Sequence, residues 1–108
     1  GLPLDDEDFH PIPKKDIITR VLRNLINSAD QERDREARLR YVNALVAVDP
    51  ADRYNRTMRA LIHYGEERFS DALVDLEYLI SEFPQAPEVA PLLEIRNRLI
   101  EQGKSINR

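Results

Sequence analysis

Two apolar runs in this chain end in the same way, LVAVDP at residues 45–50 and YLISEFP at residues 78–84. The prolines that close them, Pro50 and Pro84, lie 34 residues apart (84 − 50 = 34). Sliding the sequence by this distance also pairs apolar positions: Leu39 with Leu73, Val42 with Leu76, Leu45 with Leu79 and Val46 with Ile80. A period of this length is typical of a repeated helix–turn–helix unit. The spacing therefore predicts two helical hairpins.

Apolar residues recur at three- and four-residue steps through most of the chain, which is the pattern of helices with one buried face. The first such stripe is formed by Ile17, Val21, Leu22, Leu25, Ile26 and Ala29. Asp34 is placed to cap a second helix, and Asp49-Pro50 to end it. Gly65 is expected to end the third helix and Gly103 the fifth. We predict five helices and no strand, an all-α fold.

The third helix is expected from about Asp52 to Tyr64, and His63 is expected to be partly exposed on it. Its predicted inward positions are Tyr54, Met58, Leu61 and Ile62. The first helices of the two units match poorly at the 34-residue period, because Leu22 meets Arg56 and Leu25 meets Arg59. We therefore predict two degenerate repeats of tetratricopeptide type, at about residues 14–50 and 52–84, followed by a capping helix at about 87–103.

Composition fits one helical domain over residues 13–108. The whole net charge of −4 is local, because the four acidic residues from Asp5 to Asp8 leave the remaining residues balanced, with 16 acidic and 16 basic groups. Residues 1–12 are predicted to be an acidic, proline-containing linker or tail. The chain has no cysteine, which fits the cytoplasm, and no apolar run long enough to cross a membrane.

No pattern of catalytic or metal-binding residues is present. His10 and His63 lie far apart, without a second ligand at helical spacing. Most carboxylates stand four residues from a basic group, as Glu36 does from Arg40, which is typical of solvated helix faces. We expect no enzymatic activity in this chain, no cofactor and no metal.

A basic and amide-rich set suggests a groove for a ligand or partner. It comprises Arg20, Arg23, Asn24 and Asn27 on the first helix, and Asn55, Arg56 and Arg59 on the third. Because guanidinium groups bind carboxylates in a bidentate manner, these residues could together bind an acidic ligand. In the alternative interpretation Arg20 and Arg23 are ordinary exposed residues, and Arg56 and Arg59 pair with Asp52 or other nearby acids.

The segment FHPIPKKDIITRVLRNL, residues 9–25, resembles the entry to the C-terminal tetratricopeptide tail in a bacterial family of transglutaminase-like proteins. The matching residues are Phe9, Pro11, Lys14, Lys15, Asp16, Ile17, Arg20, Leu22, Asn24 and Leu25. The resemblance extends over roughly residues 9–95. It implies a non-catalytic tail, with residues 1–8 left from an interdomain linker and a catalytic core located upstream.

Three functions follow as hypotheses. The first is a protein-interaction module that docks on an upstream domain of the same chain or recruits a protein partner. The second is a homodimerisation domain that pairs through the exposed end of a short helical stack. The third is a nucleic-acid-binding accessory domain, suggested by RDREARLR at residues 33–40. We do not expect nucleic-acid binding, because the body of the chain is electrically neutral.

Overall fold

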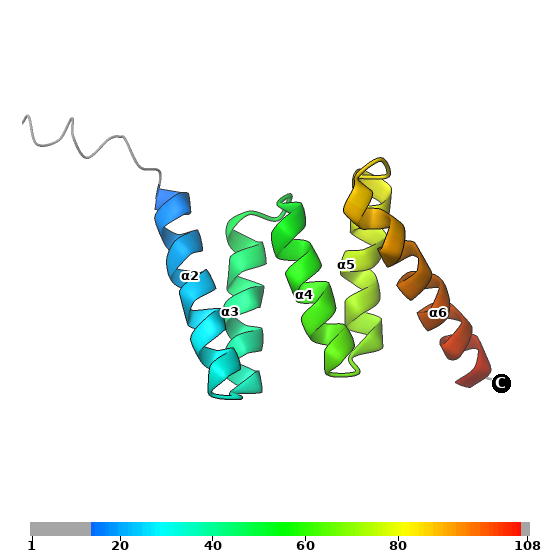
Figure 1. The fold of residues 1–108 in the computed structure, drawn as a ribbon, viewed down its shortest axis with the longest axis horizontal. Coiled ribbons are helices and arrows are strands. Elements are labelled where there is room, and N and C mark those ends of the chain that lie inside the picture. The colour runs from blue at the N-terminus through cyan, green and yellow to red at the C-terminus, as the bar shows by residue number, and fades with distance from the viewer. Residues whose placement is uncertain (1–13, 107–108) are drawn as a thin grey trace, which may run out of the picture. The chain divides into compact units, whose positions relative to one another are not determined.

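The computed structural model describes residues 14–106, with side chains for residues 14–103. These residues form five α-helices and one short 3-10 helix, and no strand occurs within them (Figure 1). The predicted all-α fold of helical hairpins is therefore confirmed. The linker predicted over residues 1–12 lies outside the described residues. The chain divides into two units, one ending at Asp49 and the other beginning at Pro50, and each is described by itself.

The first unit is a hairpin of α2 (Lys14–Gln31) and α3 (Arg35–Val48), which lie side by side (Figure 1). Asp34 caps α3 as predicted, because its side chain accepts a hydrogen bond from the Ala37 N–H at 3.1 Å. The core of this unit consists of Ile26 and Ala29 from α2 and Ala37, Val42, Leu45 and Val46 from α3.

The second unit contains α4 (Arg53–Gly65), α5 (Phe69–Glu82), the short 3-10 helix η1 (Pro87–Val89) and α6 (Ala90–Ile106). Helix α5 packs against α4 on one side and α6 on the other (Figure 1). The central buried cluster contains Ala60, Ala72, Leu76, Leu79, Leu92 and Leu99. Asp52 caps α4, accepting a hydrogen bond from the Asn55 N–H at 2.9 Å.

Helix length and turn conformation recur in the two hairpins at the predicted interval of 34 residues. Helices α3 and α5 each have 14 residues, and their first residues, Arg35 and Phe69, are 34 positions apart (69 − 35 = 34). The turns before them each contain one residue in the left-handed region, Arg33 with φ 58° and Glu67 with φ 61°. These two positions also differ by 34 (67 − 33 = 34), so the period extends to the turn geometry.

The two glycines predicted to stop helices have different outcomes. Gly65 is the last residue of α4, as predicted, and the residue with positive φ in the turn that follows is Glu67. The predicted stop at Gly103 is wrong. Helix α6 continues through Gly103 to Ile106, because one glycine costs a helix only about 1 kcal/mol. The two nearby prolines occupy separate elements, since Pro87 begins η1 and Pro91 is the second residue of α6.

The predicted inward face of α4 is partly wrong. Tyr54 is 62% exposed and Leu61 is 49% exposed, whereas the buried residues of α4 are Asn55, Ala60 and His63. The reason lies in the packing of α4 against α5, where Ala60 and Ala72 share one buried cluster. Small side chains let two helices approach closely, so the larger apolar residues of α4 are displaced from that contact.

Candidate functional site

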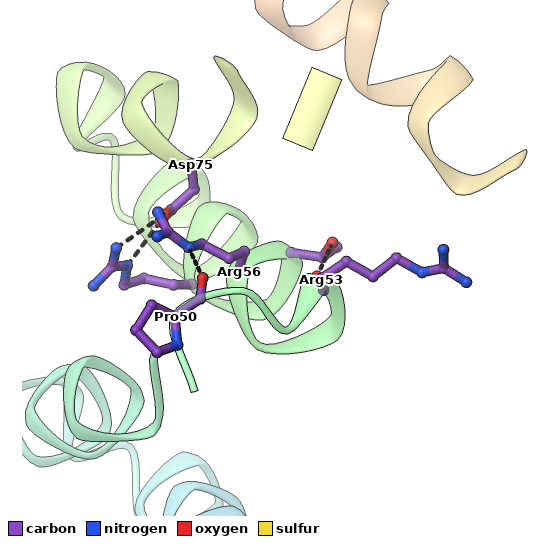
Figure 2. A network of polar contacts seen from close by, with 6 residues as sticks. Pro50, Arg53, Arg56 and Asp75 are labelled. Atoms are coloured by element: carbon purple, nitrogen blue, oxygen red, sulfur yellow. Dashed lines mark hydrogen bonds and ion pairs between the residues drawn. The ribbon is translucent and has the colours of Figure 1, made fainter. Parts of the chain in front are cut away.

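A buried carboxylate lies at the contact between α4 and α5. Asp75 of α5 is fully buried, and it accepts hydrogen bonds from two arginines of α4 (Figure 2). Arg59 binds it with two hydrogen bonds, from Nε to Oδ2 at 2.7 Å and from Nη2 to Oδ1 at 2.9 Å. Arg56 adds a third, from Nη1 to Oδ1 at 3.1 Å. The three-residue spacing of the arginines places them on one face of α4, so both reach the same carboxylate.

Arg56 also connects the start of the second unit to this network. Its Nε donates a hydrogen bond of 2.7 Å to the carbonyl oxygen of Pro50. Its guanidinium lies 3.9 Å from the centre of the Tyr78 ring, the geometry of a cation–π contact. Figure 2 shows Arg56 between Asp75 and Pro50, with Arg53 pointing away from them. The side chain is thus held by three different groups.

The charges of this network stabilise one another. The hydrogen bonds that Arg59 donates to Asp75 raise the pKa of Arg59 above its usual value, while burial acts in the opposite direction. A buried carboxylate without such partners would carry a large desolvation cost. The arrangement is therefore a structural ion-pair network that joins α4 to α5.

His63 lies one helical turn beyond Arg59 and is only 7% exposed, contrary to the expectation that it is partly exposed. Its Nδ1 is buried and has no hydrogen-bond partner among the described residues. Burial lowers the pKa of His63 below its ordinary value, and the charges of Asp71 and Asp75 partly offset this effect. His63 is accordingly a neutral residue of the hairpin interior at pH 7.

The predicted groove residues fall into two sets. Arg20, Arg23 and Asn24 line an open depression of about 480 Å³ together with Asp16 and Thr19. These are all residues of α2, brought together by the helical turn.

The other members of the predicted groove have different surroundings. Asn27 is exposed on α2, whereas Asn55 is buried in α4. Arg56 and Arg59 pair with a nearby acid, as the alternative interpretation expected, but that acid is Asp75 and not Asp52, which caps α4. The binding of an acidic ligand by the whole set stays a prediction.

A second candidate surface is apolar and lies on α2. Ile17 and Ile18 are each 45% exposed, Val21 is 50% exposed and Leu25 is 38% exposed. At about 3.6 residues per turn these side chains form one stripe, which we call the α2 stripe. The depression formed by Arg20, Arg23 and Asn24 lies around the other side of the same helix. Only the far edge of the predicted apolar face, at Ile26 and Ala29, is buried in the hairpin.

Two functional features were missed from the sequence. Asp75 was not singled out, although it stands inside the apolar run ALVDLEYLI, residues 72–80, where a carboxylate needs a partner. The apolar stripe predicted for this helix from the sequence did not include Ile18, which is part of the exposed α2 stripe. Among residues 14–106 there is no group of three or more metal-type side chains, and no helix there is long and apolar enough to cross a membrane.

Comparison with known proteins finds a few distant relatives with similar sequences. No family model matches it, and no solved structure does. It is 30% identical over 103 residues to a UPF0162 protein of Buchnera aphidicola from Acyrthosiphon pisum, covering 95% of this chain and 38% of that protein. It is 33% identical over 84 residues to Protein SirB1 of Salmonella typhimurium, covering 78% of this chain and 31% of SirB1. The chain thus spans less than two fifths of the length of these curated relatives.

Proposed function

We propose that this chain is a non-catalytic protein-interaction module, the tetratricopeptide-like tail of a larger cytoplasmic protein of the transglutaminase-like family. Three observations support this proposal. The hairpins repeat at 34 residues, the length of a tetratricopeptide unit. The segment from Lys14 to Leu25 carries the helical part of the family's entry pattern. The relatives contain much more polypeptide than the matched region.

The observation that carries the interaction role is the α2 stripe. Four large aliphatic side chains on one helix face remain between 38% and 50% exposed. Single exposed apolar residues are ordinary, but a contiguous apolar patch is often functional, as an interaction surface or a ligand-binding groove. The exposed face of a capping helix in a repeat protein is normally polar, whereas this exposed face of α2 is apolar.

The non-catalytic part of the proposal is supported by the finding that the buried charged groups pair with one another. Asp75 and both of its arginines take part in ion pairs within the second unit. His63 is buried one helical turn from Arg59. These groups are accounted for by the packing of α4 on α5.

Hydrogen exchange tests the proposal. We would compare the isolated 108-residue chain with the endogenous protein purified from its source, and follow the peptide that covers α2. If the module docks through α2, its amides exchange at least about tenfold more slowly in the endogenous protein, because docking suppresses local opening. The peptide of α6 is the internal control. Equal rates for α2 in both samples would contradict an interaction through this helix.

Self-association is a second candidate, favoured by the symmetry of the stripe. Residues 17 and 25 are equally distant from Val21, so two antiparallel copies of α2 would place Ile17 against Leu25 and Val21 against Val21. Light scattering distinguishes this case, since it predicts twice the mass of one chain.

A further inference from the structure

We propose that the depression on the polar side of α2 binds the acidic run of the same chain, Asp5–Asp8, as an intramolecular ligand. This depression is the one lined by Arg20, Arg23 and Asn24. The inference goes beyond the proposed interaction role, because it concerns the polar side of α2 and not the α2 stripe. Three observations support it: the hydrogen-bond donors of the depression, the distribution of charge along the chain, and the reach of the acidic run.

The depression contains groups that bind carboxylates. Arg20 and Arg23 supply two guanidinium groups, each of which can donate two parallel hydrogen bonds to one carboxylate. Thr19 and Asn24 add a hydroxyl and an amide that can also donate. Arg20 is exposed and forms no ion pair with another described side chain. Asp16 is the one acid among the described lining residues, so their net charge is positive.

The charges of the chain are unevenly distributed. The four acids from Asp5 to Asp8 face a short basic segment, residues 14–25, which has four basic groups and one acidic group, a net charge of +3 (4 − 1 = 3). Residues 26–108 have 12 basic and 15 acidic groups, a net charge of −3 (12 − 15 = −3). The first part of α2 therefore attracts the acidic run, whereas the rest of the chain as a whole repels it.

The acidic run is close enough in sequence to reach both arginines. Asp8 precedes Lys14 by six residues, which span about 20 Å when extended. Arg20 and Arg23 lie about 9 Å and about 14 Å beyond Lys14 along α2, at 1.5 Å per residue. A chain that doubles back at the start of α2 thus brings carboxylates level with both side chains. The proline at position 13 favours this reversal, because the residue before a proline is disfavoured in helical backbone.

Another pair of exposed arginines in the first unit lies too far away for Asp8. Arg33 and Arg35 line a pocket beside the turn between α2 and α3. This turn follows Gln31, which is about 26 Å from Lys14 along α2. That distance exceeds the extended span between Asp8 and Lys14. Arg33 and Arg35 therefore provide a charge-matched control.

A spin label near the acidic run tests the inference. Because the chain has no cysteine, Leu4→Cys creates a single attachment site beside the run without removing a charge. Nuclear magnetic resonance of the isotope-labelled 108-residue chain then measures how strongly the label broadens each amide signal of α2. We expect the broadening at residues 20–24 to fall at least about twofold in about 1 M sodium chloride, where the Debye length is about 3 Å.

Charge variants locate the binding site. Neutralising the acidic run, with Asp5→Asn, Asp6→Asn, Glu7→Gln and Asp8→Asn, should reduce the broadening as much as salt does. The double variant Arg20→Gln, Arg23→Gln should have the same effect, whereas Arg33→Gln, Arg35→Gln should not. The neutralised run leaves residues 14–108 unchanged, so the test remains valid even if an arginine variant alters the fold.

Three results would overturn the inference. Equal broadening with the neutralised run would mean that only the covalent link keeps the label near α2. Loss of broadening in the Arg33, Arg35 variant alone would assign the acidic run to the other arginine pair. Broadening in a mixture of spin-labelled and separately isotope-labelled chains would show binding between copies. None of these results depends on the α2 stripe, so each leaves the proposed interaction role intact.

Discussion

The carboxylate of Asp75 and the guanidinium of Arg59 face each other through two hydrogen bonds, of 2.7 and 2.9 Å, at the centre of the α4–α5 hairpin. This bidentate pair joins two helices that also share an apolar cluster, with Ala60 from α4 and Ala72, Leu76 and Leu79 from α5. Asp75 is fully buried, while the side chain of Arg59 remains 19% exposed. The pair therefore holds the hairpin together and still keeps part of its positive charge near water.

Replacing Asp75 by Asn should lower the free energy of unfolding by about 3–5 kcal/mol, because two arginines lose their charged partner in a buried site. Urea denaturation followed by circular dichroism measures the change. Glu82→Gln, at the exposed last residue of α5, is the control and should cost less than about 1 kcal/mol. Equal losses for the two variants would show that the network does not stabilise the hairpin.

Replacing Arg59 by Lys should cost about 1–2 kcal/mol although the charge is kept. Lysine is a point charge and cannot form both parallel hydrogen bonds to Asp75. The same substitution at exposed Arg98 of α6 should leave the urea midpoint unchanged within error. A midpoint for Arg59→Lys equal to that of the unmodified chain would mean that charge alone suffices at this position.

Acidification should destabilise the chain through His63. Because burial lowers its pKa, the unfolded state binds a proton at a higher pH than the folded state does. The stability contributed by neutral His63 is present above the unfolded pKa of about 6.5 and is lost as the pH falls below it towards the folded value. Urea midpoints at about pH 7.5 and about pH 5.5 measure the loss. In His63→Gln the decrease should be smaller; an identical decrease would assign it to other groups.

Loss of the Asp34 cap should destabilise α3. Asp34→Ala removes the acceptor for the Ala37 N–H and should cost about 1 kcal/mol. Asp34→Ser supplies another capping oxygen and should restore most of this stability. Thermal unfolding of the three proteins distinguishes the cap from a general charge effect, which Ser would not restore.

Val21→Ala and Ile26→Ala compare the two sides of the apolar face of α2. Ile26 is 5% exposed, and its truncation should cost about 2–5 kcal/mol through a cavity in the hairpin. Val21 is half exposed, and its truncation in the isolated chain should change stability by less than about 1 kcal/mol. A large loss for Val21→Ala would mean that the stripe is already covered within these 108 residues.

Much of the fold could be predicted because local rules act over a few residues. The caps at Asp34 and the stop at Asp49-Pro50 follow from hydrogen bonds of the first and last helical turns. The 34-residue interval reappears in the bounds of α3 and α5. The predicted stop at Gly103 was wrong, because a single glycine does not end a helix and α6 continues to Ile106.

The candidate site could be predicted only in part. The arginines at positions 56 and 59 were identified as a charged pair on one helix face, but their partner belongs to α5, sixteen or more residues away. Sequence periodicity does not show which carboxylate a guanidinium reaches, because many acids compete at similar separations. The depression at Arg20, Arg23 and Asn24 was anticipated as a cluster, since helical spacing alone brings these residues together.

The sequence by itself determined where the helices lie and which side of each is apolar, because these properties depend on propensity, capping and a period of about 3.6 residues. Only the tertiary structure decided how much of that apolar side is used. Helix α3 covers Ile26 and Ala29 and leaves Val21 exposed, since a helix contacts its neighbour along a strip narrower than its apolar face. In the second unit, the packing of α5 on α4 likewise decides that Asp75 is buried beside Arg56 and Arg59. In the first unit, the α2 stripe lies outside the contact strip and stays exposed.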